Sequence, residues 1–272
     1  MNYIDFYQLK EQPFSIAVDN RFYYSSQQHA SALLKLKYAA EHRKGLAVLI
    51  GEVGTGKTTL ARQLLEELPE DQYESALLVV LHSAITSSWF LRKIAIQLGA
   101  SPEAASEKSD LLTQVYNRLV DIYDEGKKAI VLIDEAQMLH NREVMEELRG
   151  MLNIELDGKK LITFILFGLP DLDDVLTLDR PLKQRMSIRY EFHSLTMDMT
   201  EEYVRYRLDV AGAQKALFTA QSLVDIHQYS KGIPRLINTI CDNALLEGFL
   251  LKKEVIDEKM IQEVATDLKL IG

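Results

Sequence analysis

The sequence predicts an α/β fold, in which helices sandwich a parallel five-stranded sheet and a small all-α domain follows. Short apolar runs alternate with segments of helical periodicity over the first two thirds of the chain. A glycine-rich loop stands directly between the first apolar run and a helix. After about residue 195 the strand signals stop and only helical patterns remain. These observations place an α/β domain, with an aromatic leader, at residues 1–194 and a helical domain at 195–272.

Each apolar run is long enough for one strand, and the segments between the runs have helical spacing. The expected strands are residues 46–50, 76–81, 129–135, 161–167 and 187–192. The expected helices of the first domain are residues 26–42, 58–68, 87–98, 109–123 and 137–152, with a further helix opened by residues 168–171. Those of the second domain are residues 200–211, capped by Thr200, and then 219–229, 234–251 and 257–268.

Residues 51–59 form a candidate phosphate cradle, the P-loop, between a strand and a helix. Its glycines let the backbone wrap a phosphate, with successive N–H groups pointing inward at a helix N-terminus. Lys57 adds a point charge for the β- and γ-phosphates, and the Thr58 hydroxyl is placed to ligate Mg²⁺. We therefore predict that the chain binds ATP, with Lys57 also catalytic. The predicted ATP-binding residues of the loop are Gly51, Glu52, Val53, Gly54, Thr55, Gly56, Lys57, Thr58 and Thr59.

A second motif ends the third expected strand, where apolar residues lead into Asp134 and Glu135. Asp134 is expected to hold Mg²⁺ together with Thr58 and to belong to the ATP site. Glu135 points elsewhere and can orient or deprotonate the attacking water. Acids often terminate strands, but downstream of a phosphate loop this pattern favours a metal ligand and a general base.

Two groups of arginines complete the candidate site. Arg180, Arg185 and Arg189 cluster before and within the fifth expected strand. They could form a solvated basic face, or Arg185 could be a finger that reaches the γ-phosphate of a neighbouring subunit, since a planar guanidinium suits that charge. In the helical domain, Arg235 follows Gly-Ile-Pro at a helix start. A structural turn explains the glycine and the proline but not Arg235, which we predict to sense the nucleotide.

The composition indicates in which compartment the protein works and which partners are disfavoured. The formal net charge of −9 argues against broad, sequence-blind DNA binding. The single cysteine, Cys241, cannot form an internal disulfide and is expected to be a small core residue. Neither a signal peptide nor a membrane segment is predicted. We therefore expect a cytoplasmic protein, with attachment to the inner membrane only through a partner.

Together these features resemble the AAA+ superfamily of P-loop ATPases, with Walker A and Walker B motifs and a helical lid that carries Gly-x-Pro-Arg. The leader gives a closer resemblance: residues 6–14, 19–22 and 26–29 are similar to the start of the general secretion pathway protein A (ExeA-like) ATPases. The motifs at 51–58, 134–137, 168–172 and 184–185 continue it. One departure concerns Leu169, which stands where that family often has glutamine, so the sensor of the γ-phosphate is left unassigned.

The resemblance implies a Mg²⁺-dependent ATPase that cleaves the β–γ phosphoanhydride and forms homo-oligomers when it binds ATP. Its turnover would drive assembly or remodelling of a protein partner in a secretion, pilus or envelope-export system. The alternative is a DNA-dependent ATPase of the transposition-helper type, which the acidic balance disfavours. A passive nucleotide switch needs neither Glu135 nor Arg185, and a small-molecule kinase has no role for the helical lid.

Overall fold

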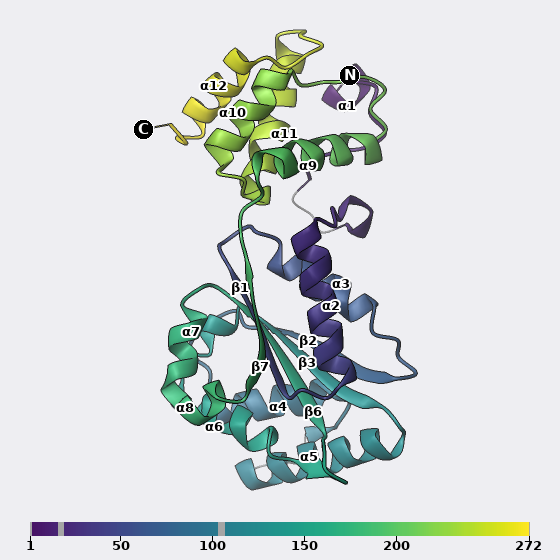
Figure 1. Cartoon of the computed structure of the whole chain (residues 1–272), viewed down its shortest axis with the longest axis vertical. Helices are drawn as coiled ribbons and strands as arrows, with labels where there is room; N and C mark the ends of the chain where they lie inside the picture. Colours follow the sequence, from purple (N-terminus) through teal and green to yellow (C-terminus); the bar gives the residue numbers. More distant parts are fainter. Residues whose placement is uncertain (1, 16–18, 103–106, 272) are drawn as a thin grey trace. The chain divides into compact units, whose positions relative to one another are not determined.

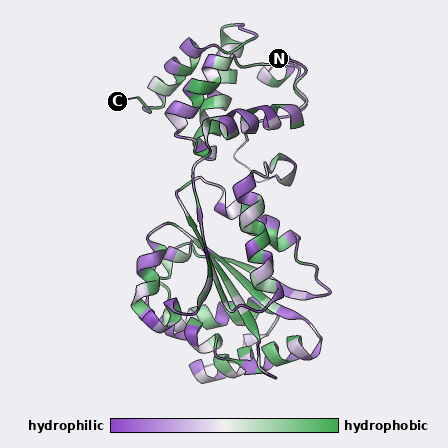
Figure 2. Cartoon of the chain, in the orientation of Figure 1, coloured by the Kyte–Doolittle hydropathy of each residue, from purple (hydrophilic) through white to green (hydrophobic). Residues whose placement is uncertain are grey.

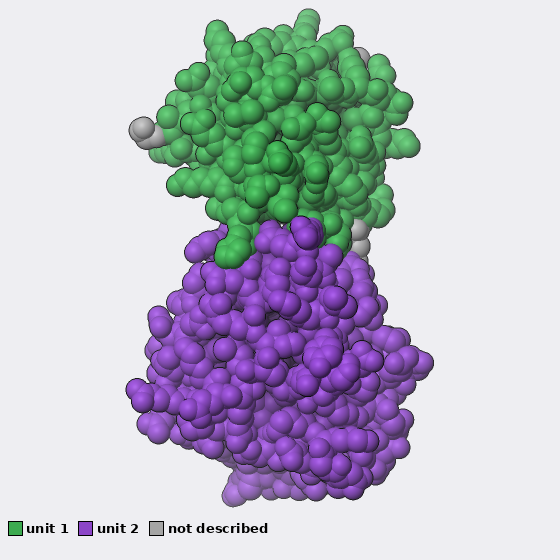
Figure 3. Space-filling view, in the orientation of Figure 1, with its two compact units in different colours: residues 1–26, 54–56, 193–272 green, residues 27–53, 57–192 purple. Residues whose placement is uncertain are grey.

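The computed structural model describes residues 2–15, 19–102 and 107–271, and the chain divides into two compact units (Figure 3). Residues 27–53 and 57–192 make the first, which we call the sheet unit. Residues 1–26, 54–56 and 193–272 make the second, the helical unit. The predicted fold class, a parallel five-stranded sheet with helices and a helical part after it, is confirmed.

The sheet unit is built on five parallel strands in the order β2-β3-β6-β1-β7. The strands are β1 (Leu46–Gly51), β2 (Tyr73–Val79), β3 (Lys128–Asp134), β6 (Ile162–Gly168) and β7 (Met186–Phe192). The three central strands are buried along almost their whole length, which explains their continuous apolar sequences. Figure 2 shows these strands as the hydrophobic centre of the unit. A separate two-stranded hairpin joins β4 (Glu155–Leu156) to β5 (Lys159–Lys160).

Helices lie on both sides of this sheet (Figure 1). The α-helices of the sheet unit are α2 (Gln27–Glu41), α3 (Lys57–Glu66), α4 (Ser87–Gln97), α5 (Lys108–Asp124), α6 (Arg142–Met151), α7 (Leu172–Val175) and α8 (Arg180–Lys183). Two 3-10 turns, η3 (Ala136–Met138) and η4 (Leu176–Asp179), complete it. The apolar faces of α4, α5, α6, α7 and α8 form one continuous core with the strand residues that face them. Buried apolar residues of α2 and α3 lie outside that core.

The helix expected from Gln137 to Leu152 begins later than the sequence predicts. Residues 136–138 form only the turn η3, and α6 starts at Arg142. Asn141 caps α6 because its side-chain oxygen accepts a hydrogen bond from the Glu143 N–H at 2.9 Å. The extended backbone of this cap separates Gln137 from the helix and leaves its side chain in the loop after β3.

The helical unit contains α1 (Tyr3–Phe6), η1 (Asn20–Phe22), α9 (Met197–Val210), α10 (Ala220–Ser230), α11 (Pro234–Leu250) and α12 (Glu258–Asp267). The prediction that Thr200 caps the first of the four long helices is wrong. Thr196 is the cap, and Thr200 is a fully buried residue whose hydroxyl donates to the Thr196 carbonyl at 2.9 Å. Cys241 is fully buried, as expected, and burial raises the pKa of its thiol well above the usual value.

The aromatic leader packs within the helical unit, although the sequence predicts it to belong to the α/β domain. Phe14 is buried and packs edge-to-face on Phe218. The Tyr7 hydroxyl donates to the Lys253 carbonyl at 3.0 Å, and buried Arg207 donates to the Pro13 carbonyl at 2.5 Å. The leader thus supplies large apolar side chains to a core that four helices alone would leave small.

In the part of the chain that the structure describes, no helix combines the length and apolar character that a membrane crossing requires.

Candidate functional site

The glycine-rich loop leaves the carboxyl end of β1, a strand buried at every position between β6 and β7. Gly54 and Gly56 have φ angles of +81° and +102°, a backbone region that side-chain-bearing residues rarely adopt. Lys57 then begins α3, so that the loop ends at a helix N-terminus. This is the strand, loop and helix order that a phosphate cradle needs.

Lys57 is almost fully buried, at 6% exposure. Its ammonium donates to the carbonyl oxygens of Gly51 at 2.8 Å and Glu52 at 2.9 Å. These bonds fold the side chain back over the loop and hold its charge against the loop backbone. A positive charge in that position attracts the anionic oxygens of a phosphate.

Thr58 and Asp134 meet at the carboxyl edge of the sheet. The Thr58 hydroxyl donates to Asp134 Oδ2 at 2.6 Å, and the Glu135 N–H donates to Asp134 Oδ1 at 3.0 Å. Asp134 is only 1% exposed, and burial raises the pKa of its carboxyl group, an effect that the two hydrogen bonds oppose. A cation beside this carboxylate would stabilise its charged form.

The donor set of this pair suits magnesium, which prefers oxygen ligands and keeps several waters or phosphate oxygens in its shell. One hydroxyl and one carboxylate are enough protein ligands for an ion held jointly with a nucleotide. Among the described residues there is no group of three or more His, Cys, Asp and Glu side chains arranged for a metal. Thr58 and Asp134 therefore fit a shared, phosphate-dependent ion rather than a metal held by protein alone.

Glu135 turns sharply after the buried Asp134. Its φ and ψ are 56° and 38°, a left-handed conformation that costs a non-glycine residue on the order of 1–3 kcal/mol. Its carboxylate is partly exposed and accepts a hydrogen bond from Gln137 Nε2 at 2.6 Å. No role was predicted for Gln137; the available signal was an amide side chain two residues after Glu135.

Arg185 lies at the other end of the sheet from the loop. It precedes β7, whose first residue pairs with Leu46, whereas the loop follows Gly51 at the far end of β1. Five strand residues separate those ends by roughly 17 Å at about 3.3 Å per residue. Arg185 Nη1 donates to the Arg149 carbonyl at 3.2 Å and to Asn153 Oδ1. The structure therefore does not bring Arg185 to the phosphate loop of its own chain.

The other predicted arginines differ in their surroundings. Arg189 is paired with Asp173 at 2.7 Å and with Glu191 at 3.1 Å, so acids already neutralise its charge. Arg235 is exposed at the start of α11, and its N–H donates to the Gly54 carbonyl at 3.3 Å within the helical unit. A Cβ added to Gly54 would lie 2.7 Å from the Arg235 Cβ, so this approach requires glycine.

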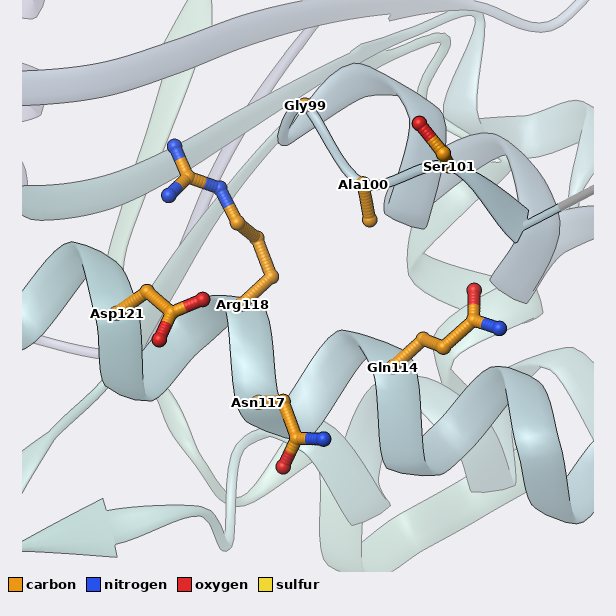
Figure 4. A pocket seen from close by; sticks show the side chains of 7 residues that line it. All are labelled: Gly99, Ala100, Ser101, Gln114, Asn117, Arg118 and Asp121. Carbon is orange, nitrogen blue, oxygen red and sulfur yellow. The ribbon is translucent and has the colours of Figure 1, made fainter.

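An open pocket of about 370 Å³ lies elsewhere in the sheet unit, between the residues after α4 and the helix α5 (Figure 4). Its cationic residue, Arg118, bonds the Leu98 carbonyl and Glu74 near the amino end of β2. That end of the sheet is opposite to the phosphate loop, and no predicted site residue lines the pocket. The residues predicted to bind the nucleotide therefore lie away from this pocket.

Several known proteins are similar to this chain in sequence or in fold. The AAA domain family matches residues 40–176. The chain is 39% identical over 249 residues to general secretion pathway protein A of Aeromonas hydrophila, a match over 91% of this chain and 45% of that protein. It is 26% identical over 152 residues to an uncharacterized HTH-type transcriptional regulator of Methanocaldococcus jannaschii, covering 54% and 37% of the two chains. The chain thus spans less than half the length of both relatives.

Solved structures agree with this fold. The Aeropyrum pernix ORC2 protein in ADPNP–ADP complexes superposes with a TM-score of 0.72 at 14% identity, over 94% of this chain and 71% of that one. The Thermotoga maritima RuvB Holliday junction branch migration motor gives 0.58 at 20% identity, over 89% and 70%. These likenesses concern the fold alone. With the 39% identity, the family match confirms the resemblance drawn from the motifs: the chain belongs to the AAA domain family and is a relative of general secretion pathway protein A.

Proposed function

We propose that this chain binds Mg²⁺-ATP at the loop of residues 51–59 and hydrolyses its β–γ phosphoanhydride. The observation that carries the proposal is the 2.6 Å bond between the Thr58 hydroxyl and the buried Asp134 carboxylate. It joins the helix after the phosphate loop to the end of β3, where Asp134 is followed by Glu135. Membership of the AAA domain family supports nucleotide hydrolysis as the general activity.

Each residue has a separate task in this proposal. The backbone of residues 51–59 and the Lys57 ammonium bind the phosphates. Thr58 and Asp134 would hold Mg²⁺, which when bound neutralises charge between the β- and γ-phosphates. Glu135 accepts a proton from the attacking water. Arg235, whose backbone bonds Gly54, is proposed to respond to the nucleotide through its exposed side chain.

Oligomerisation is part of the proposal because Arg185 has no route to its own phosphate loop. A guanidinium at the amino end of β7 can serve a neighbouring subunit instead. The similarity to general secretion pathway protein A supports a partner in a secretion or envelope assembly system. We propose a cytoplasmic location, with recruitment to the inner membrane through that partner.

The alternative is a DNA-dependent ATPase of the transposition-helper type, which would use the same nucleotide site. The net charge of −9 gives no general attraction to DNA. Stimulation of ATP turnover by duplex DNA at physiological salt would favour the alternative over a protein partner.

Lys57→Ala is expected to weaken ATP binding at least about tenfold, because a charge-assisted phosphate contact contributes about 1.5–3 kcal/mol. The affinity is measured by titration calorimetry with a non-hydrolysable ATP analogue and Mg²⁺. Lys44→Ala, at a partly exposed lysine just before β1, is the matched control and should bind normally. Unchanged affinity in Lys57→Ala would contradict the assignment of the loop.

Glu135→Gln is expected to retain Mg²⁺-ATP binding and to lose at least about a hundredfold in turnover, since general-base assistance contributes ~10²–10⁴ in rate. Phosphate release under saturating ATP measures the loss. Glu143→Gln, at an exposed acid on α6, should keep wild-type turnover. If Glu135→Gln instead abolishes binding, Glu135 is a metal or structural residue and not the base.

Arg185→Ala is expected to bind ATP normally and to hydrolyse it very slowly, because the finger it removes belongs to the neighbour's site. Mixing Arg185→Ala with Lys57→Ala should restore part of the activity, since one variant keeps a working pocket and the other a working arginine. Steady-state turnover of the mixture is measured with co-assembly checked by light scattering. Co-assembly without any recovery of turnover would show that Arg185 does not act in trans.

A further inference from the structure

Gln137 connects Glu135 to the end of the neighbouring strand β6. Its side chain is buried, at 7% exposure, in the turn η3. Nε2 donates to Glu135 Oε2 at 2.6 Å, and Oε1 accepts from the Leu169 N–H at 3.1 Å. One amide group therefore joins the carboxylate after β3 to the backbone directly after β6.

The chemistry of these partners fixes the orientation of the amide. The Leu169 N–H can only donate, so it must face the amide oxygen. The amide NH₂ is then left facing the Glu135 carboxylate, which can only accept when ionised. Reversing the amide would set an oxygen against a carboxylate and an NH₂ against an N–H. The Gln137 amide therefore has one stable orientation, with its oxygen toward Leu169 and its NH₂ toward Glu135.

Gly168, the last residue of β6, makes room for the Gln137 amide. A Cβ added to Gly168 would lie 2.9 Å from Gln137 Oε1 and 2.8 Å from a Leu172 side-chain carbon. Both distances are shorter than ordinary contacts. Because this residue has no side chain, the amide oxygen can approach the backbone at the end of the strand.

We propose that Gln137 is a positioning residue, whose amide holds the Glu135 carboxylate in its productive orientation by anchoring it to the backbone after β6. A glutamate side chain has three rotatable bonds, and a base misplaced by about 1 Å can lose ~10²-fold in rate. The left-handed backbone conformation of Glu135 sets the direction of its side chain, and the hydrogen bond from Gln137 holds the carboxylate. Leu169 contributes only its backbone N–H, so the strand tip acts on the base through Gln137.

This inference rests on the proposed role of Glu135 as the base. Gln137→Glu is the informative variant, because it keeps the length and the acceptor for Leu169 but removes the donor to Glu135. Gln137→Met, which is neutral and similar in length, removes both the donor to Glu135 and the acceptor for Leu169 without adding a charge. Turnover, Mg²⁺-ATP affinity and the thermal unfolding midpoint are measured for both, alone and combined with Glu135→Gln.

We expect both variants to bind Mg²⁺-ATP within about threefold of wild type and to lose roughly 10–100-fold in kcat, a part of the base's full contribution. In the Glu135→Gln background, neither should lower kcat by more than about twofold, since the group they orient is gone. A purely structural role would instead lower the unfolding midpoint or the affinity and would slow both backgrounds equally.

Three results would overturn the inference. The first is an unchanged or raised kcat in Gln137→Met. The second is a loss in Gln137→Glu alone, which would indicate charge repulsion rather than a lost donor. The third is an equal loss in the presence and absence of Glu135. If Glu135→Gln keeps wild-type turnover, Glu135 is not the base, and the inference about Gln137 fails with that proposal. If Glu135→Gln loses turnover while both Gln137 variants keep it, only the inference about Gln137 is refuted.

Discussion

The hydrogen bond between Thr58 and Asp134 is the contact on which the proposed nucleotide site depends. The two residues come from segments that are far apart in the chain, the helix after β1 and the end of β3, and β6 lies between those strands. Neighbouring strands are about 4.8 Å apart, so α3 must begin over the end of β6 for the bond to form. The short glycine-rich loop joins β1 to α3, and the positive φ angles of Gly54 and Gly56 allow the tight connection that this placement needs.

Burial of Asp134 raises the free-energy cost of keeping its carboxylate ionised. Asp134 is almost inaccessible to solvent, and an ionised carboxylate there needs hydrogen bonds and a nearby cation. Thr58 and the Glu135 backbone supply the bonds. The same sharp turn that brings the Glu135 N–H back to Asp134 separates the two acids. One can therefore hold a metal while the other faces the loop of Gln137.

Several parts of this arrangement could be predicted from the sequence because they follow from local patterns. Buried parallel strands are apolar throughout, so the strands were predicted correctly. The glycine loop has fixed spacing, which made Lys57, Thr58 and Asp134 candidates for the site, and their roles stay predictions. Other parts depend on tertiary contacts. The core that takes up the leader and the approach of Gln137 to Leu169 have no periodic signal. The cap at Thr196 is a local contact with the Met199 N–H, but Thr200 offers the same residue type for that role. The roles of Arg185 and Arg235 stay predictions.

The most direct test of the central contact is the dependence of ATP-analogue affinity on Mg²⁺ concentration in Thr58→Val, Asp134→Asn and the double variant. Asp134→Asn retains an oxygen that can accept from Thr58, so the fold should survive. The account predicts that Mg²⁺ strengthens binding in the wild type, that each single variant loses most of this effect, and that the double variant loses little more. An undiminished Mg²⁺ effect in either single variant would contradict the account.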